Sequence, residues 1–389
     1  MMKKICVITG SRADYSLLKN VMINIKSSKS LSLQLVVTGM HLSPKFGLTF
    51  KEIEEDGLLV DEKIEMLLSG DKPSSIAKSI GLGTILFSEC FKKLSPDMIV
   101  LLGDRFEILS CALSAMVLRI PIAHIHGGEV TPHLIDESIR HSITKMSQIH
   151  FVSTDNYKKR VIQMGENPRN VHLVGGLGID NIKKIKFLSK TDLEKKLKLT
   201  FLDKNLLVTF HPLTLEQNSS SKQMKQLLSA LALLKDTLVI FTMPNADTDG
   251  DIIFNLINNF VEANQNARVF TSLGEKIYLS VAKLMDGVVG NSSSGLIEIP
   301  SLGVGTVNIG DRQKGRVSGG SVIHCKPYTK SILAAIKKVQ SKKFKLNIKS
   351  GKNPYGDGGA SKKVVKIIER TVLKNLILKE FYDLENIDH

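Results

Sequence analysis

Four ionisable side chains in the first half of the chain lie where proton-transfer chemistry is expected. Asp104 closes the apolar run MIVLLG, and His126 and Glu129 close the next run, IPIAHIH. Asp136 lies on the helical pattern that comes next. Carboxylates and histidines are the side chains that most often move protons in general acid–base catalysis. We therefore expect Asp104, His126, Glu129 and Asp136 to be catalytic.

Plainer interpretations apply to two neighbouring side chains. In an alternating strand His124 and His126 point to the same side, but only His126 reaches the loop, so His124 is predicted to be a buried, hydrogen-bonded histidine. Asp136 and Arg140 are four residues apart and share a helix face, where an ion-paired surface is the plainer interpretation. The nearby strand ends, which carry two further carboxylates, favour a functional role for Asp136.

The segment GNSSSG at residues 290–295 is the strongest predicted anion site. It follows an apolar run and precedes the helix-like LIEIPSLG. Small residues let backbone N–H groups approach phosphate oxygens, and a helix N-terminus adds partial positive charge. A serine N-cap is the plainer alternative, but three consecutive serines exceed what a cap needs. Ser292, Ser293 and Ser294 are therefore predicted phosphate ligands.

Other strand ends offer cations and a histidine. Arg12 lies in GSRAD after the first run, and this loop lacks both GxGxxG and GxxxxGK[ST], so neither NAD nor ATP is supported. Arg12 is predicted to pair with a diphosphate, with a role within its own domain as the alternative. His211, which follows NLLVTF, can donate to phosphate when it is protonated, and we expect it to be catalytic as well. Arg312 in GDRQKGR adds a cation, and Asn245 closes another run.

Length and composition set the frame for these residues. A chain of 389 residues exceeds one typical core and suits two domains. With 42% apolar and 23% charged residues it has an ordinary globular composition, and its four scattered cysteines indicate neither disulfides nor a zinc site. The net charge of +15 is spread out rather than concentrated, so nucleic-acid binding is not expected. The basic N-terminus has the pattern of a first strand rather than of a signal peptide. No apolar run is long enough to span a membrane, so we expect a cytoplasmic protein.

The pattern of apolar runs predicts an α/β protein with two doubly wound, Rossmann-like domains. Nearly all-apolar runs alternate with helical patterns, as in parallel sheets that are covered on both faces. The runs are KICVIT, LQLVVTG, MIVLLG, IPIAHIH and IHFVS, and then NLLVTF, LVIFTM, ARVFT, DGVVGN and VGTVNI. The expected domains are residues 1–177 and 178–368, joined by a glycine- and lysine-rich hinge. A final segment, 369–389, is expected to be a C-terminal helix that could pack on its own domain or on the first.

Eight motifs in register resemble the hydrolysing UDP-N-acetylglucosamine 2-epimerases of sialic-acid and legionaminic-acid biosynthesis. They are GSRADY, GDRFE, HIHGGE, IDESIRHSITK, HP, GNSSSG, IEIPSLG and GDRQKGR, and the resemblance spans about residues 3 to 370. It implies a glycosyltransferase-B-like pair of domains with the active site in the interdomain cleft. It also implies a UDP-amino-sugar substrate, a homodimer or homotetramer, and neither metal nor cofactor.

The resemblance also implies roles for individual residues. The sugar would face Asp104, Glu129 and Asp136. UDP would be held by a larger set, namely Arg12, His211, Asn245, Ser292, Ser293, Glu298 and Arg312. Many relatives have HIEGGE where this sequence has HIHGGE, so His126 takes the place of a catalytic glutamate. The base at carbon 2 is therefore either His126 or Glu129.

Three rival functions use the same features. A glycosyltransferase would pass the sugar to an acceptor, a non-hydrolysing epimerase would return the nucleotide sugar intact, and a sensor would only bind it. The several ionisable groups at the sugar end exceed what binding a neutral sugar requires. The sugar itself is either N-acetylglucosamine or its 2,4-diacetamido-2,4,6-trideoxy analogue. The loop 131–134 could distinguish carbons 4 and 6, and a loop that serves only packing is the equal alternative.

Overall fold

The computed structural model describes residues 2–68, 73–131, 135–211, 219–243, 250–271, 273–349 and 351–384. Contacts divide the chain into two compact units. Unit 1 consists of Met1–Glu129, Ile135–Asn181 and Gly358–His389, and unit 2 of Val130–Leu134 and Ile182–Asp357. By contacts, therefore, residues 178–181 and 358–368 go with the first unit.

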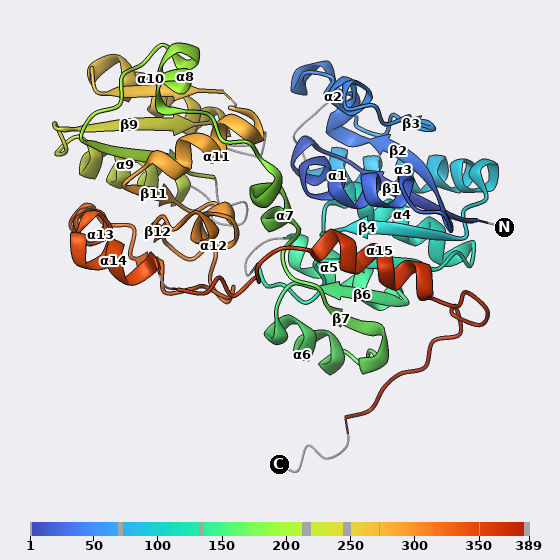
Figure 1. The fold of residues 1–389 in the computed structure, drawn as a ribbon. Helices are drawn as coiled ribbons and strands as arrows, with labels where there is room; N and C mark the ends of the chain where they lie inside the picture. Colours follow the sequence, from blue (N-terminus) through green and yellow to red (C-terminus); the bar gives the residue numbers. More distant parts are fainter. Residues whose placement is uncertain are drawn as a thin grey trace. The chain divides into compact units, whose positions relative to one another are not determined.

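Unit 1 is built on a seven-stranded parallel sheet with the order β3-β2-β1-β4-β5-β6-β7 (Figure 1). Its strands are β1 (Lys3–Thr9), β2 (Leu31–Thr38), β3 (Glu62–Ile64), β4 (Met98–Leu102), β5 (Ile122–Ile125), β6 (Ile149–Val152) and β7 (Val171–Leu173). Its helices are α1 (Arg12–Lys26), α2 (Phe50–Glu55), α3 (Pro73–Leu94), α4 (Phe106–Val117), α5 (Ile135–Met146), α6 (Asp155–Gln163) and α15 (Ala360–Arg370), and α7 (Leu177–Lys184) crosses the boundary between the units.

Unit 2 repeats this plan on a six-stranded parallel sheet with the order β10-β9-β8-β11-β12-β13. Its strands are β8 (Lys204–Thr209), β9 (Thr237–Thr242), β10 (Ala267–Phe270), β11 (Gly287–Gly290), β12 (Thr306–Ile309) and β13 (Val322–Cys325). Its helices are α8 (Lys190–Leu197), α9 (Ser219–Leu231), α10 (Gly250–Ala263), α11 (Gly274–Leu284), α12 (Ser294–Ile297), α13 (Thr329–Gln340) and α14 (Lys342–Lys349). The predicted α/β class with two doubly wound domains is confirmed.

The strand order reverses at one point in each sheet. In unit 1 the chain moves outward from β1 to β3 and then returns to place β4 on the other side of β1; in unit 2, β8 and β11 flank the same kind of reversal. Loops that follow two such strands diverge to opposite faces and leave room at the carboxyl ends, where ligands bind in this fold class. Functional side chains are therefore expected after β1 and β4 and after β8 and β11.

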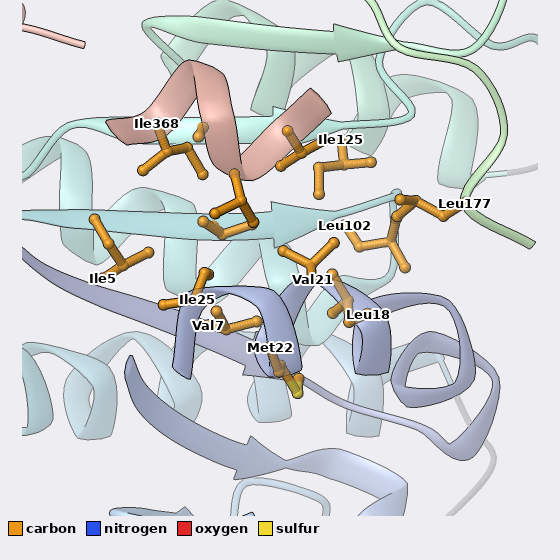
Figure 2. Packing of buried hydrophobic residues seen from close by; sticks show 14 of the residues in the cluster. Ile5, Val7, Leu18, Val21, Met22, Ile25, Leu102, Ile125, Leu177 and Ile368 are labelled. Atoms are coloured by element: carbon orange, nitrogen blue, oxygen red, sulfur yellow. The ribbon is translucent and has the colours of Figure 1, made fainter. Parts of the chain in front are cut away.

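Helix α1 illustrates why these sequences form these elements. The Ser11 side chain caps it by accepting from the Asp14 amide. Leu18, Val21, Met22 and Ile25 then recur at helical spacing, and all four are buried. Figure 2 shows them packed on the strands together with α15, whose Ile368 joins the same cluster. The last helix of the chain therefore packs on unit 1, but it covers Ala360–Arg370, and the described residues 371–384 of the predicted C-terminal helix form no helix.

An aspartate from α7 fixes the start of α15. The carboxylate of Asp180, which is buried, accepts hydrogen bonds from the amides of Gly359, Ala360 and Ser361 at 2.5, 3.0 and 2.7 Å. These amides begin a helix and have no partner within it. Negative charge at a helix N-terminus is also stabilising. Asp180 thereby fastens a segment about 180 residues away in sequence to unit 1.

The segment after α15 is held to unit 1 by a buried glutamate. Glu166 accepts from Lys145 and Lys379 at 2.7 Å each and pairs with His150 at 2.9 Å. Burial alone would raise the pKa of Glu166, but the three hydrogen bonds lower it by more than burial raises it, so the pKa falls to about 2.

The four cysteines are free, as expected. Across the described residues, no helix is long and apolar enough to cross a membrane.

We predict that Asp180→Asn weakens the docking of α15, because one charged acceptor of three amides is lost. Hydrogen bonds to charged groups contribute about 1.5–3 kcal/mol, so a loss of that order is expected. Hydrogen exchange of residues 360–370, followed by mass spectrometry, should accelerate. The control is Glu54→Gln, which removes an exposed pair with Lys63. Equal exchange in both variants would contradict this role of Asp180.

Candidate functional site

A buried arginine organises the carboxylates at the edge of the unit 1 sheet. Arg140 on α5 is 1% exposed and pairs with Asp104, which follows β4. Its Nη1 also donates to the backbone oxygen of Glu129 and to Glu137 Oε2, both at 2.9 Å. The alternative of an ion-paired surface does not hold for Arg140, which is buried and pairs with Asp104 and Glu137. One guanidinium thus fixes the ends of two neighbouring strands.

Asp136, on the first turn of α5, is half-buried. Burial raises its pKa to about 6, with a further contribution from the nearby Asp104 carboxylate, while Arg105 and Arg140 oppose the shift. A carboxyl group with a pKa this close to neutrality can both give and accept a proton at working pH. Asp104 and Asp136 therefore lie close enough for the charge of one carboxylate to raise the pKa of the other.

The two candidate bases lie beside each other. His126 Nδ1 is 3.7 Å from Glu129 Oε1, and both side chains are largely buried. His126 has a φ of 67°, which is uncommon outside glycine, and its amide donates to the Phe151 carbonyl at 2.9 Å. Backbone conformations of this kind gather at functional sites. The choice of base between His126 and Glu129 stays open.

His124 is a structural histidine, as predicted. It is fully buried and contacts Thr144 Oγ1 at 3.1 Å and the Gly103 carbonyl at 2.7 Å. Burial lowers its pKa to about 3, so the ring is neutral. The Gly103 contact ties β5 to the residue that precedes Asp104, and His124 thereby supports the loop that carries this carboxylate.

Two carboxylates that the sequence analysis overlooked lie at the reversal between β1 and β4. Glu107 is fully buried and accepts from Arg105 Nη2 at 2.9 Å. Asp14 is close to both, and burial raises its pKa to about 6. Asp14 Oδ2 and Glu107 Oε2 are buried without a hydrogen-bond partner among the described residues. Asp14 lies in GSRAD and Glu107 in GDRFE, and their position shortly after a predicted strand is the feature of the sequence that could have indicated a role.

Arg12 is the first residue of α1, at the same edge. Its Nε is 3.0 Å from Glu52 Oε2, and both side chains are 42% exposed. Exposed ion pairs contribute little to stability. Exchanging Glu52 for an anionic ligand would therefore cost little, and the predicted role of Arg12 is compatible with its position.

The unit 2 reversal brings His211 and the serine segment together. His211 follows β8 and is largely buried, and its Nδ1 has no hydrogen-bond partner among the described residues. Burial, followed by the charge of Arg312, lowers its pKa to about 3. The imidazole is therefore neutral in this structure, since a buried ring beside an arginine disfavours positive charge. Protonation of His211 against a phosphate stays a prediction.

The serine segment presents amides rather than a long helix. Gly290, which ends β11, has a φ of 144°, and a Cβ there would lie 1.8 Å from the Thr209 oxygen, so only glycine fits. The amides of Ser292 and Ser293 donate to no other described residue. Helix α12 has only four residues and continues as the 3-10 helix Ile299–Leu302, so the expected contribution of a helix dipole is small.

The remaining predicted ligands are distributed around this turn. Ser294 accepts a hydrogen bond from Tyr278 at 3.2 Å, and Glu298 is half-buried at the end of α12. Arg312 Nη1 donates to the Asn291 carbonyl at 3.1 Å. Asn245 lies outside the described residues. Within the described ranges, no three His, Cys, Asp or Glu side chains are placed to hold a metal ion.

Comparison with known proteins places the chain among nucleotide-sugar enzymes. Residues 23–369 match the model of the UDP-N-acetylglucosamine 2-epimerase family. The chain is 44% identical to GDP/UDP-N,N'-diacetylbacillosamine 2-epimerase (hydrolyzing) of Campylobacter jejuni, over 98% of this chain and 99% of the relative. It is 40% identical to polysialic acid biosynthesis protein P7 of Escherichia coli, over 98% of each chain.

Solved structures show the same fold. UDP-GlcNAc 2-epimerase from Neisseria meningitidis, bound to UDP-GlcNAc, has a TM-score of 0.82 at 16% identity, over 95% of this chain and 100% of that one. S. aureus MnaA with UDP has a TM-score of 0.81 at 17% identity, over 99% and 100% of the two chains.

We predict that the imidazole of His211 stays neutral between pH 5 and 8. A folded-state pKa of about 3 lies far below the ordinary value of about 6.5, so no titration should occur in this window. The Cε1–H NMR resonance, assigned with His211→Gln, should keep its position while added free imidazole titrates normally. A midpoint near 6.5 would contradict the effect of burial.

Proposed function

The chain belongs to the UDP-N-acetylglucosamine 2-epimerase family, and we propose that it is a hydrolysing member. It converts a UDP-amino sugar and water into the free manno-configured amino sugar and UDP, for nonulosonic (sialic or legionaminic) acid biosynthesis. The observation that carries this proposal is the similarity over 98% of the chain to a relative named as a hydrolysing 2-epimerase. The interacting carboxyl pair Asp104–Asp136 supports it, because epimerisation requires proton transfers.

Two sugars are candidates. Relatives named as acting on N,N'-diacetylbacillosamine, which is the 2,4-diacetamido-2,4,6-trideoxy sugar, are 44% and 34% identical to this chain. We therefore favour that substrate. N-acetylglucosamine is the second candidate, because a Neisseria meningitidis protein named UDP-N-acetylglucosamine 2-epimerase is 32% identical over 87% of this chain.

The proposed reaction has two steps, elimination of UDP and then addition of water. The hydrogen at carbon 2 is barely acidic, so a base, His126 or Glu129, removes it as the anomeric C–O bond breaks and UDP departs with that electron pair. The product is a 2-acetamido-glycal. One carboxylate then takes a proton from water as the water oxygen bonds to carbon 1, and the other carboxyl group donates a proton to carbon 2 from the opposite face. Asp104 and Asp136 guide the water and return the proton, and each such acid–base contribution is typically 10²–10⁴-fold.

We assign the nucleotide side to the end of the unit 2 sheet and to one loop of unit 1. The Ser292 and Ser293 amides donate to no other described residue, and Arg312 is held beside them by its hydrogen bond to the Asn291 carbonyl. Preorganised donors aimed at developing charge are usually the largest catalytic contribution. The assigned set is Arg12, His211, Asn245, Ser292, Ser293, Ser294, Glu298 and Arg312.

We also propose a homodimer or homotetramer in the cytoplasm. Light scattering of the purified protein tests the first part, and a single-chain mass would contradict it. Fractionation of cells that express the full chain tests the second, and recovery with membranes would contradict it.

The function predicts a specific product when the protein is incubated in deuterated water with each UDP-sugar separately. Proton NMR should show UDP and free manno-configured sugar with deuterium at carbon 2, because the returned proton comes from solvent. Intact UDP-sugar with deuterium at carbon 2 would indicate the non-hydrolysing epimerase. If neither sugar shows exchange or UDP release, the epimerase assignment fails and the glycosyltransferase becomes the better proposal.

Single substitutions separate the proton-transfer roles. We expect Asp104→Asn and Asp136→Asn each to lower kcat about 10²-fold or more, with UDP affinity retained, since each removes one acid–base group. Of His126→Gln and Glu129→Gln, the one that replaces the base should abolish UDP release. Turnover at the wild-type rate would remove the corresponding residue from the mechanism. The control is Glu137→Gln, which alters another Arg140 contact without removing a proposed acid or base.

A further inference from the structure

Asn291, directly after β11, makes an unusual set of contacts for a side chain without an assigned role. It is 1% exposed. Its Oδ1 accepts from the His211 amide at 2.7 Å, and its Nδ2 donates to the His211 carbonyl at 2.8 Å. One amide group thus binds both backbone groups of one residue on the neighbouring strand end, across the point where the strand order of unit 2 reverses.

The backbone of Asn291 connects a third strand end to the same place. Its carbonyl accepts from Arg312 Nη1 at 3.1 Å and from Gln313 Nε2 at 2.9 Å, and both donors follow β12. Its amide donates to the Thr209 carbonyl at 3.2 Å, at the end of β8. Asn291 therefore fixes the ends of β8, β11 and β12 relative to one another.

The chemistry of this position requires a carboxamide. Pairing with a backbone N–H and C=O at once takes one acceptor and one donor at fixed separation, which asparagine offers and aspartate or leucine does not. Side chains that hold functional groups in place act through such hydrogen bonds, and small displacements of the supported groups are costly to function.

We propose that Asn291 is a positioning residue for the nucleotide site: it places His211 and Arg312 beside the serine amides, and so determines how tightly UDP binds. The inference rests on the proposed function, because it takes these residues as the UDP ligands. Asn291 itself need not touch the nucleotide.

The test is a double-mutant cycle on UDP affinity, measured by calorimetry on the full chain. Asn291→Ser removes the clamp without adding charge, and we expect the Kd for UDP to rise at least tenfold. His211→Gln alone should also weaken binding. In the Asn291→Ser background, His211→Gln should add less than twofold, because an imidazole that is no longer held in place has little left to contribute.

The matched control is Asn308→Ser. Asn308 is equally buried on β12 and contacts His324 rather than His211. Asn308→Ser should leave the Kd for UDP near the wild-type value. His211→Gln should raise the Kd by the same factor in the Asn308→Ser background as in the wild-type protein. If Asn291→Ser is not folded by circular dichroism, the uncharged and nearly isosteric Asn291→Leu, which also lacks the donor and the acceptor, replaces it in the same cycle.

Each outcome decides one question. Two results would overturn the positioning role and leave Asn291 as a purely structural residue. The first is a wild-type Kd for UDP in the Asn291 variant. The second is a Kd in the double variant that equals the product of the two single effects. Failure of the wild-type protein to bind UDP would instead contradict the assigned nucleotide site. Retained binding without turnover would contradict the proposed reaction but not the role of Asn291.

Discussion

The reversal of strand order in each parallel sheet is the constraint on which the candidate site depends. Buried parallel strands present their carboxyl ends at one edge, and only at a reversal do neighbouring loops diverge to opposite faces. In unit 1 the reversal gathers Asp14, Arg105 and Glu107 around the ends of β1 and β4. In unit 2 it sets His211 against Asn291 at the ends of β8 and β11. The two units thus prepare different chemistry with one geometric device.

The carboxyl edges of the two sheets differ in the charged groups that they carry. Unit 1 buries carboxylates and holds them with arginines, above all Arg140, whose removal would leave uncompensated buried charge. The pairing keeps Asp104 in place while the neighbouring Asp136 has its pKa raised to about 6. Such pairs of titratable groups in unequal environments are typical of acid–base sites. Unit 2 offers amides, a neutral imidazole and an arginine, which suits an anion.

The sequence predicted the inner strands well and the outer ones poorly. Runs such as MIVLLG are apolar because both faces of the strand are covered, and every predicted run corresponds to a strand. The missed strands β3, β7 and β13 have three or four residues each and lie at sheet edges, where side chains are partly exposed and no apolar run is required.

The same distinction applies to the site. The strand-end motifs located Asp104, His126 and Ser292, because residue type and position after a strand can be read from letters. Burial cannot be read in this way. The sequence therefore missed that Arg140 lies inside the protein and that His211 is neutral. It also gave no sign that Asn291 clamps His211, since that contact joins residues 80 positions apart.

The neutral state of His211 has a consequence for the leaving group. Two forces oppose its protonation, burial and the positive charge of Arg312. A diphosphate placed against both side chains would neutralise the second and favour the charged imidazole. Binding of the nucleotide would then raise the pKa of His211 above its value in the free protein. Under the proposed mechanism, the charge that stabilises departing UDP would be created by the substrate itself, after it has excluded water from the site.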